Sequence, residues 1–337
     1  MSIEILIRAP LALLPVLIFL TTLKYLDGFK LTGLRTTLYV IAVGIAATAV
    51  SYYCNGFLMS VLQIEFLQYA RYGAPFVEEV LKAAVIVYLF HTNRIGFLTD
   101  AAILGFAVGA GFAITENIYY LHLLGGSNVG IWIIRGFGTA IMHGGATAIF
   151  AVLAQALTER HTKTNPMRYL PSLAVAISLH SVFNHFPGTP VLTTLVTLVA
   201  LPVVLSYVYE RSTNLVHKWL EVDFDAEEEL LELIRKGKFT HSKAGQFLLD
   251  LCTSFDGATV ADMLCYIRLH TELALRAKSV LIAREFGTEI PIEQDVRDKL
   301  MEMDALQKNI GNIGFLAMAP YFHLSRKELW EMFMLKQ

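Results

Sequence analysis

The stretch APFVEEVLKAAVIVYLF, from Ala74 to Phe90, places two adjacent glutamates inside an apolar run. Ionisable groups within a membrane segment are energetically costly, and they usually face the interior of a helix bundle and serve a function there. Three further apolar segments carry similar polar side chains: Glu116-Asn117, His143, and His180 with Asn184. Carboxylate, imidazole and amide groups on four segments predict a hydrolytic site inside a helical membrane protein.

The composition divides the chain into an apolar part and a more ordinary part. The 337 residues are 55% hydrophobic and 17% charged, whereas soluble proteins average about 45–50% apolar and about 25% charged residues. The apolar excess lies before about Arg211, and no basic block indicates nucleic-acid binding. The three cysteines form no Cys-x-x-Cys motif. We expect Cys252 and Cys265 to be reduced and buried.

The apolar part contains seven candidate membrane segments, since a spanning helix needs about 20 mostly apolar residues. The third and sixth segments are short, and the sixth contains two histidines. The predicted fold is all-α: a polytopic membrane bundle of about seven spans, followed by a soluble helical domain. The segments cover about residues 7–23, 37–58, 75–90, 99–121, 131–157, 169–185 and 191–209.

Three regions follow from this division. We expect a transmembrane domain with the hydrolytic site over residues 1–210, a linker over 211–224 and a cytosolic helical domain over 225–337. A helix is expected to start at Asp225 with acidic residues and to end with basic ones, which matches the helix dipole, and Gly237 predicts its C-cap. We expect this domain to bind a cytosolic protein partner. Its further helices are expected over residues 242–254, 258–286, 292–318 and 325–335, the last with a capping box of Ser325 and Glu328.

Lysine and arginine residues in the short loops predict the orientation, because such residues favour the cytoplasmic side. The loops that carry most of them alternate along the chain. We therefore expect a multi-pass protein of the cytoplasmic membrane with its N-terminus outside and its C-terminal domain in the cytoplasm. Arg8, Arg71 and Arg135 then fall on the outer side. The four polar segments alternate in direction, and this orientation brings their polar residues toward one layer, with His143 deeper in the membrane.

The two adjacent glutamates cannot both face the site directly, because neighbouring residues point about 100° apart on a helix. Either Glu78 or Glu79 is expected to act as a general base. Lys82 follows Glu78 by four residues, so we expect these two side chains to be partners. The alternative is a helix start, where Pro75 suits the first turn and acidic residues are favoured.

The remaining polar groups also allow two interpretations each. Glu116-Asn117 follows a glycine-rich stretch that predicts close helix packing, although the pair could also reach interfacial water. His143 could be a core histidine. His180 and Asn184 share a helix face and could donate hydrogen bonds to an oxyanion, or His180 could hold a metal ion. The chain contains no His-Glu-x-x-His motif, so a zincin-type site is not supported.

Taken together, four motifs resemble the PrsW family of intramembrane proteases. They are EEVLK (78–82), FAITEN (112–117), HGGATA (143–148) and HSVFN (180–184), and the resemblance covers about residues 35–210. The wider superfamily includes type II CAAX prenyl endopeptidases and bacteriocin-immunity-type membrane proteins. In the CAAX endopeptidases the second motif ends in His, whereas this chain has Glu116-Asn117, which favours the PrsW branch.

The resemblance implies hydrolysis of peptide bonds in membrane-anchored proteins, such as a single-span regulator of the anti-sigma-factor kind. In the expected mechanism Glu78 or Glu79 activates a water molecule, oriented by His143 or Glu116, while His180 and Asn184 bind the oxyanion. The sequence leaves open whether one zinc ion takes part or the reaction is metal-independent. The catalytic residues that the resemblance implies are Glu78, Glu79, Glu116, Asn117, His143, His180 and Asn184.

Two other classes of protein would also carry polar groups within the membrane. A transporter or channel predicts internal repeats and broken helices in matching halves, and neither is clear in this sequence. A catalytically silent scaffold would have lost some of these polar residues, whereas all four motifs are intact.

Overall fold

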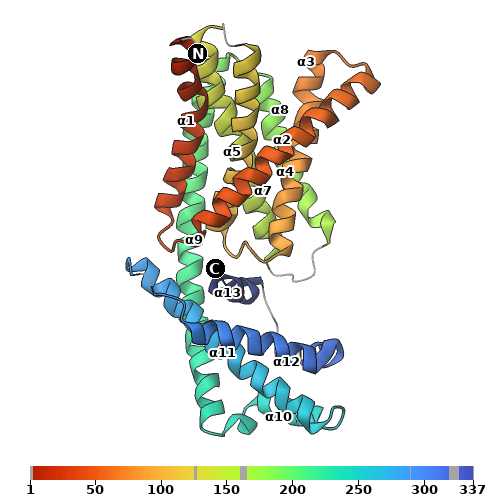
Figure 1. The fold of residues 1–337 in the computed structure, drawn as a ribbon, viewed down its shortest axis with the longest axis vertical. Coiled ribbons are helices and arrows are strands. Elements are labelled where there is room, and N and C mark those ends of the chain that lie inside the picture. Colours follow the sequence, from red (N-terminus) through yellow and green to blue (C-terminus); the bar gives the residue numbers. More distant parts are fainter. Residues whose placement is uncertain (1–2, 125–126, 160–164, 289, 319–325, 337) are drawn as a thin grey trace. The chain divides into compact units, whose positions relative to one another are not determined.

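The computed structural model describes residues 3–124, 127–159, 165–288, 290–318 and 326–336. The described residues form helices and contain no strand, which confirms the predicted all-α class. The chain divides into two compact units, and the boundary between Ser212 and Thr213 lies within one long helix (Figure 1).

The first unit is a bundle of mostly apolar helices. Among the residues that the structure describes, five helices are long and apolar enough to cross a membrane: α1, α2, α5, α6 to α7 taken as one continuous span, and α9. The third and sixth expected segments form α4 and α8, but α4 carries three charged residues and α8 has only 15 residues. The elements are α1 (Ile3–Leu26), α2 (Leu34–Leu62), α3 (Phe66–Gln68), η1 (Tyr69–Gly73), α4 (Ala74–His91), α5 (Leu98–Leu123), α6 (Val129–Ile133), η2 (Ile134–Thr139), α7 (Ala140–Thr158), η3 (Pro166–Tyr169), α8 (Leu170–Asn184) and α9 (Pro190–Arg235).

Helix α5 is the centre of this bundle, because almost every residue from Leu98 to Ala113 is buried. The expected close packing at its glycines is confirmed. A Cβ atom on Gly109 would lie 2.2 Å from the backbone oxygen of His143 in α7, and one on Gly111 would lie 2.2 Å from that of Ile41 in α2. These contacts bring the backbones of α7 and α2 against α5 and set the position of His143.

Two π-helical turns lead directly into helices that carry polar motifs. The turn η1 precedes α4, which carries Glu78 and Glu79, and the turn η2 precedes α7, which carries His143. A π-helical turn inserts an extra residue into a helix, and such turns occur frequently at functional sites.

The second unit begins within α9, and this corrects the expected start of a helix at Asp225. Helix α9 continues without a break from Pro190 to Arg235, so the stretch 211–224, which we expected to be a linker, is helical. The physical reason is that this stretch contains neither glycine nor proline to interrupt the helix. The end of the helix is as predicted: Gly237 has a φ of +66°, and its N–H donates to the Ile234 carbonyl.

The remaining expected helices of the second unit are present, whereas the expected burial of two cysteines is wrong. Cys252 and Cys265 are both exposed, because α11 turns Cys265 outward while it buries Met263 and Tyr266. Ser325 of the expected capping box lies outside the described residues. The elements are η4 (Phe239–His241), α10 (Lys243–Leu251), α11 (Gly257–Glu285), α12 (Gln294–Met318) and α13 (Arg326–Leu335).

Candidate active site

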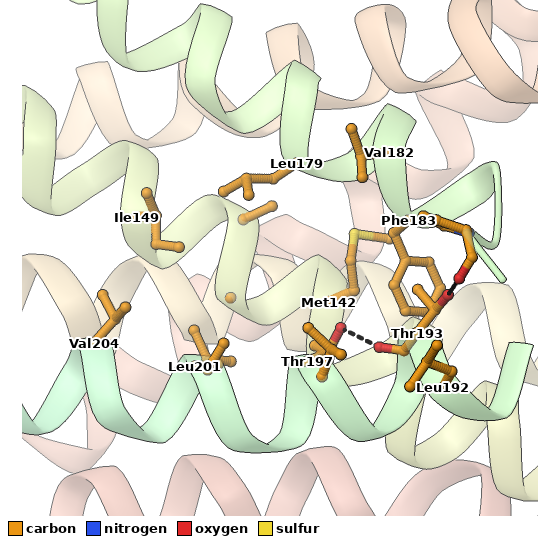
Figure 2. A pocket seen from close by; sticks show the side chains of 15 residues that line it. Met142, Ile149, Leu179, Val182, Phe183, Leu192, Thr193, Thr197, Leu201 and Val204 are labelled. Carbon is orange, nitrogen blue, oxygen red and sulfur yellow. Dashed lines mark hydrogen bonds between the residues drawn. The ribbon is translucent and has the colours of Figure 1, made fainter. Parts of the chain in front are cut away.

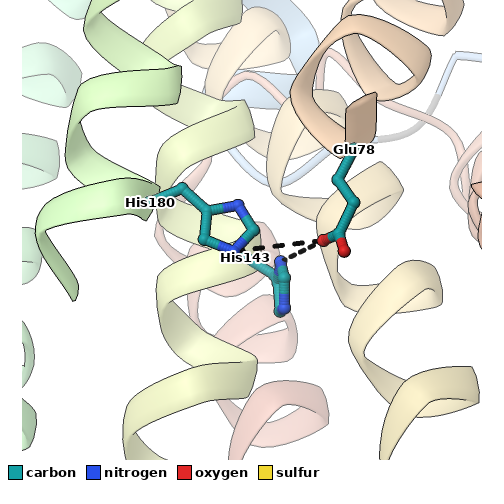
Figure 3. A group of neighbouring side chains, drawn as sticks. All are labelled: Glu78, His143 and His180. Carbon is teal, nitrogen blue, oxygen red and sulfur yellow. Dashed lines mark ion pairs between the residues drawn. The ribbon is translucent and has the colours of Figure 1, made fainter. Parts of the chain in front are cut away.

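Polar side chains from α4, α5, α7 and α8 meet inside the first unit. Glu78 lies between two histidines: its Oε2 is 4.0 Å from His143 Nδ1 and 3.9 Å from His180 Nε2 (Figure 3). The two imidazole rings lie edge to face, with their centres 4.7 Å apart. The predicted convergence of four separate motifs on one place therefore occurs in the structure.

Glu78 has a carboxylate oxygen that the surrounding protein leaves unbonded. Its Oε2 is buried and has no hydrogen-bond partner among the described residues. Its Oε1 accepts a long hydrogen bond of 3.4 Å from Asn55 of α2, which in turn accepts one of 2.9 Å from the Tyr69 hydroxyl. A buried polar oxygen without a partner is energetically costly, and such an atom between two imidazoles is typical of a reactive or ligand-binding group.

Two other carboxylates orient the histidines. His180 Nδ1 donates to Glu79 Oε1 at 2.8 Å, and His143 Nε2 donates to Glu116 Oε2 at 2.9 Å. Because an ionised carboxylate only accepts hydrogen bonds, each histidine carries its proton on the nitrogen that faces its carboxylate. The unprotonated nitrogens, Nε2 of His180 and Nδ1 of His143, then face Glu78.

The expected partner of Lys82 was wrong. Its ammonium lies 2.5 Å from Glu79 Oε1, three residues away, and not against Glu78. It also donates to His143 Nδ1 at 3.1 Å, and it is fully buried with its charge 4.6 Å from the centre of the Phe112 ring. The choice between i+3 and i+4 follows from the bundle, which places Glu79 and Lys82 together on the buried side of α4.

The two predicted asparagines hold the surrounding helices. Asn184 Nδ2 donates to the Ala70 carbonyl at 2.9 Å, so this amide holds the end of α8 against η1. Asn117 is buried, and its Nδ2 donates to the Ala12 carbonyl of α1 at 2.7 Å. Asn184 thus has a structural partner, and its predicted part in binding an oxyanion stays a prediction.

The predicted catalytic set lacked Lys82, which was expected only as a partner of Glu78, and it also lacked Arg135 and Asn55. Arg135 of η2 pairs with Glu116 at 3.3 Å, and Asn55 contacts Glu78. Both are polar side chains within or at the end of expected apolar segments, and this signal could have identified them.

An apolar cavity of about 500 Å³ lies beside the site, between α7, α8 and α9. Its wall includes Met142, the neighbour of His143, and Leu179, the neighbour of His180. Two threonines also line it, but their hydroxyls are bonded within the protein. Thr193 donates to the Pro187 carbonyl, and Thr197 donates to the Thr193 carbonyl (Figure 2). The cavity therefore offers an almost entirely apolar surface.

The residues present fit a single metal ion. Ligand atoms of Glu78, His143 and His180 lie within 4.8 Å of one another. Glu79 and Glu116 take up the second nitrogen of each histidine, as carboxylates do around histidine ligands. Three protein ligands of this kind match a catalytic zinc site. The ammonium of Lys82 competes with an ion for Nδ1 of His143.

A comparison with known protein families shows the family to which this chain belongs. The family described as PrsW family intramembrane metalloprotease matches residues 32–208, which is more than half of the chain. The chain belongs to the PrsW family. This confirms the resemblance of the four motifs, and it makes the protein an intramembrane protease that acts on membrane proteins in a lipid bilayer. Neither a curated protein nor a solved structure matches this PrsW-family chain.

Proposed function

We propose that this PrsW-family protein is an endopeptidase whose reaction centre consists of Glu78, His143 and His180. The observation that carries the proposal is the position of Glu78 Oε2, which is buried, unbonded and about equally distant from two imidazole nitrogens. Glu79 is unsuited to the same role, because its Oε1 already binds Lys82 and His180.

In the proposed reaction Glu78 takes a proton from water as the water oxygen bonds to the carbonyl carbon of the substrate. The carbon–nitrogen bond then breaks, and Glu78 returns the proton to the leaving amine. We assign stabilisation of the negative charge on the carbonyl oxygen to Lys82. Its buried ammonium is fixed near the site before the reaction begins, and a fixed charge in an apolar environment is most effective.

A metal ion enters an alternative form of this proposal, in which Glu78 is a ligand and not the general base. Glu78, His143 and His180 would hold it, and when bound it would supply a Lewis acid that activates water and polarises the carbonyl. If the reaction uses zinc, purified active protein contains about one zinc per chain and loses activity on chelation. If activity persists in metal-free protein, the metal-independent form is correct.

We further propose that the substrate is a membrane-anchored protein, such as a single-span regulator of the anti-sigma-factor kind. The apolar cavity beside His143 and His180 supports this, because its surface suits an apolar segment and offers few polar partners.

The orientation also belongs to the proposal: the N-terminus lies outside, and residues 225–337 form a cytosolic domain that binds a protein partner. The exposed cysteines of the second unit allow a direct test. A membrane-impermeant maleimide should label Cys252 and Cys265 only after the cells are permeabilised. Labelling in intact cells would contradict the orientation.

The function itself is tested in membranes by mass spectrometry of new protein N-termini. Wild type, Glu78→Gln and the matched control Glu65→Gln are compared, since Glu65 is exposed and its substitution removes the same charge. Fragments of a membrane protein should be present with wild type and Glu65→Gln and absent with Glu78→Gln. Identical fragments from a folded, equally abundant Glu78→Gln variant would overturn the proposed role of Glu78 in the reaction.

A further inference from the structure

Arg135 lies in the π-helical turn η2 and is held by one stretch of α5. Its Nε donates to Asn117 Oδ1 at 2.9 Å, and its Nη2 lies 3.3 Å from Glu116 Oε1. Its guanidinium carbon also lies 3.9 Å from the centre of the Tyr120 ring, a distance typical of a cation–π contact. Three side chains of α5 therefore fix the guanidinium in one place.

The acceptor that faces Arg135 is itself fixed. Asn117 is 1% exposed, and its amide nitrogen donates to the Ala12 carbonyl of α1 at 2.7 Å. This bond decides which way the amide points, so its oxygen faces Arg135. The arginine is thus held through Asn117 by the backbone of α1, as well as by α5.

Glu116 connects this arginine to the reaction centre. Its Oε1 faces Arg135, and its Oε2 accepts the hydrogen bond from His143 Nε2. A carboxylate bonded to one imidazole nitrogen fixes the tautomer and the orientation of the ring. Arginine stays charged at all relevant pH values, so it keeps the Glu116 carboxylate in place as an acceptor.

We propose that Arg135 is a positioning residue for the reaction: acting through Glu116, it fixes the His143 tautomer whose Nδ1 faces Glu78. This inference rests on the proposed function of Glu78 and His143. It also explains the π-helical turn, which places Arg135 toward α5 while α7 continues in the register that brings His143 to the site.

The first test is the kinetics of reconstituted protein with a single-span substrate identified from wild-type membranes. Arg135→Gln should lower kcat by about 10–100-fold, the usual effect of removing a group that orients a functional histidine. KM should stay nearly unchanged, because the substrate is bound elsewhere. Arg135→Lys should recover part of the loss, since it keeps the charge without the planar fork. The matched control is Arg35→Gln, at an exposed position of α2.

A double substitution separates action through Glu116 from a general structural effect. If Arg135 acts through Glu116, then Glu116→Gln with Arg135→Gln should lose no more kcat than Glu116→Gln alone. A multiplied loss would show that the two residues act independently. The ¹⁵N resonances of His143 should report a proton on Nε2 in wild type and a mixture of tautomers in Arg135→Gln, and this readout does not depend on activity.

The outcomes distinguish this inference from the function on which it rests. If Glu78→Gln is inactive while Arg135→Gln and Arg135→Lys match wild type, the inference about Arg135 fails and the reaction centre stands. If Glu78→Gln cleaves like wild type, the proposed function fails. If Arg135→Gln cannot be recovered folded, the rate and the His143 resonances of Arg135→Lys decide, and wild-type values of both overturn the inference.

Discussion

The two units of this protein both bury charged side chains, but the two clusters are built differently. In the second unit the ammonium of Lys278 lies 2.7 Å from Glu227 Oε1 and 2.9 Å from Glu331 Oε1. The same ammonium lies 4.8 Å from the centre of the Trp219 ring. In the membrane unit, Lys82 is likewise fully buried beside a carboxylate, that of Glu79.

The two clusters differ in what surrounds their second glutamate, which is Glu331 in the second unit and Glu78 in the membrane unit. In the second unit both carboxylates contact the lysine, and they join α9, α11 and α13. In the membrane unit only Glu79 binds the lysine, while Glu78 faces unprotonated imidazole nitrogens. Buried charge alone therefore does not identify an active site. The informative feature is a buried carboxylate oxygen that faces two oriented histidines instead of a cation.

The largest expected effect compares a buried histidine from each unit. His143→Gln should lower the rate of cleavage by about 10²–10⁴-fold, because it removes a group of the reaction centre. His270→Gln changes a buried histidine of α11 and should leave cleavage nearly unchanged. The measurement is the rate of fragment release in reconstituted membranes. Equal losses from both substitutions would contradict the distinction between the clusters.

The second prediction concerns stability in the second unit. Lys278→Met leaves the buried carboxyl groups of Glu227 and Glu331 without their cation, so we expect it to weaken the contacts that join α9, α11 and α13. We expect faster hydrogen exchange across α13, residues 326–335, in the full-length protein. The control is Lys236→Met, which removes an exposed helix pair with Glu232 and should change little. Unchanged protection of α13 in Lys278→Met would show that the cluster does not hold this helix.

A smaller effect is expected for the orienting glutamate. Glu79→Gln should lower kcat by about 10–100-fold, less than the loss of Glu78, because Glu79 acts by holding His180 and Lys82. The two variants are compared in the same cleavage assay, with their amounts in the membrane matched. A greater loss from Glu79→Gln than from Glu78→Gln would exchange the roles of the two residues.

The smallest expected effect is the pH dependence of the second cluster. Burial raises the pKa of Glu331 from 4.5 to about 8, against the lowering effect of Lys278, and the carboxylates of Glu227 and Glu328 raise it further. The folded state therefore holds a proton that the unfolded state releases above pH 4.5. Stability is lost as the pH rises through this range and levels off above about 8, with at most about 1.4 kcal/mol lost per pH unit.

Hydrogen exchange of α13 at pH 7 and pH 8 measures this effect after correction for intrinsic rates. Wild type should lose protection between these values, whereas Glu331→Gln should not. The same loss of protection in both proteins would show that another group is responsible.

The sequence predicted the helices and the motifs better than it predicted the contacts between them. Apolar segments and their glycines indicated which helices form and where they pack closely, because these properties are local. The partner of Lys82 depended on the rotation of α4 within the bundle, and the partner of Asn184 is a backbone carbonyl of η1. Neither can be obtained from spacing alone, since the π-helical turns that set these rotations leave no periodic pattern in the sequence.

We propose that the cluster around Glu78, and not the one around Glu331, carries out the reaction. The most direct measurement compares Glu78→Gln with Glu331→Gln, each a buried carboxylate changed to an amide, in purified protein reconstituted with one single-span substrate. We predict that Glu78→Gln releases no fragment and that Glu331→Gln cleaves at nearly the wild-type rate. Cleavage by folded Glu78→Gln at the wild-type rate would contradict the account.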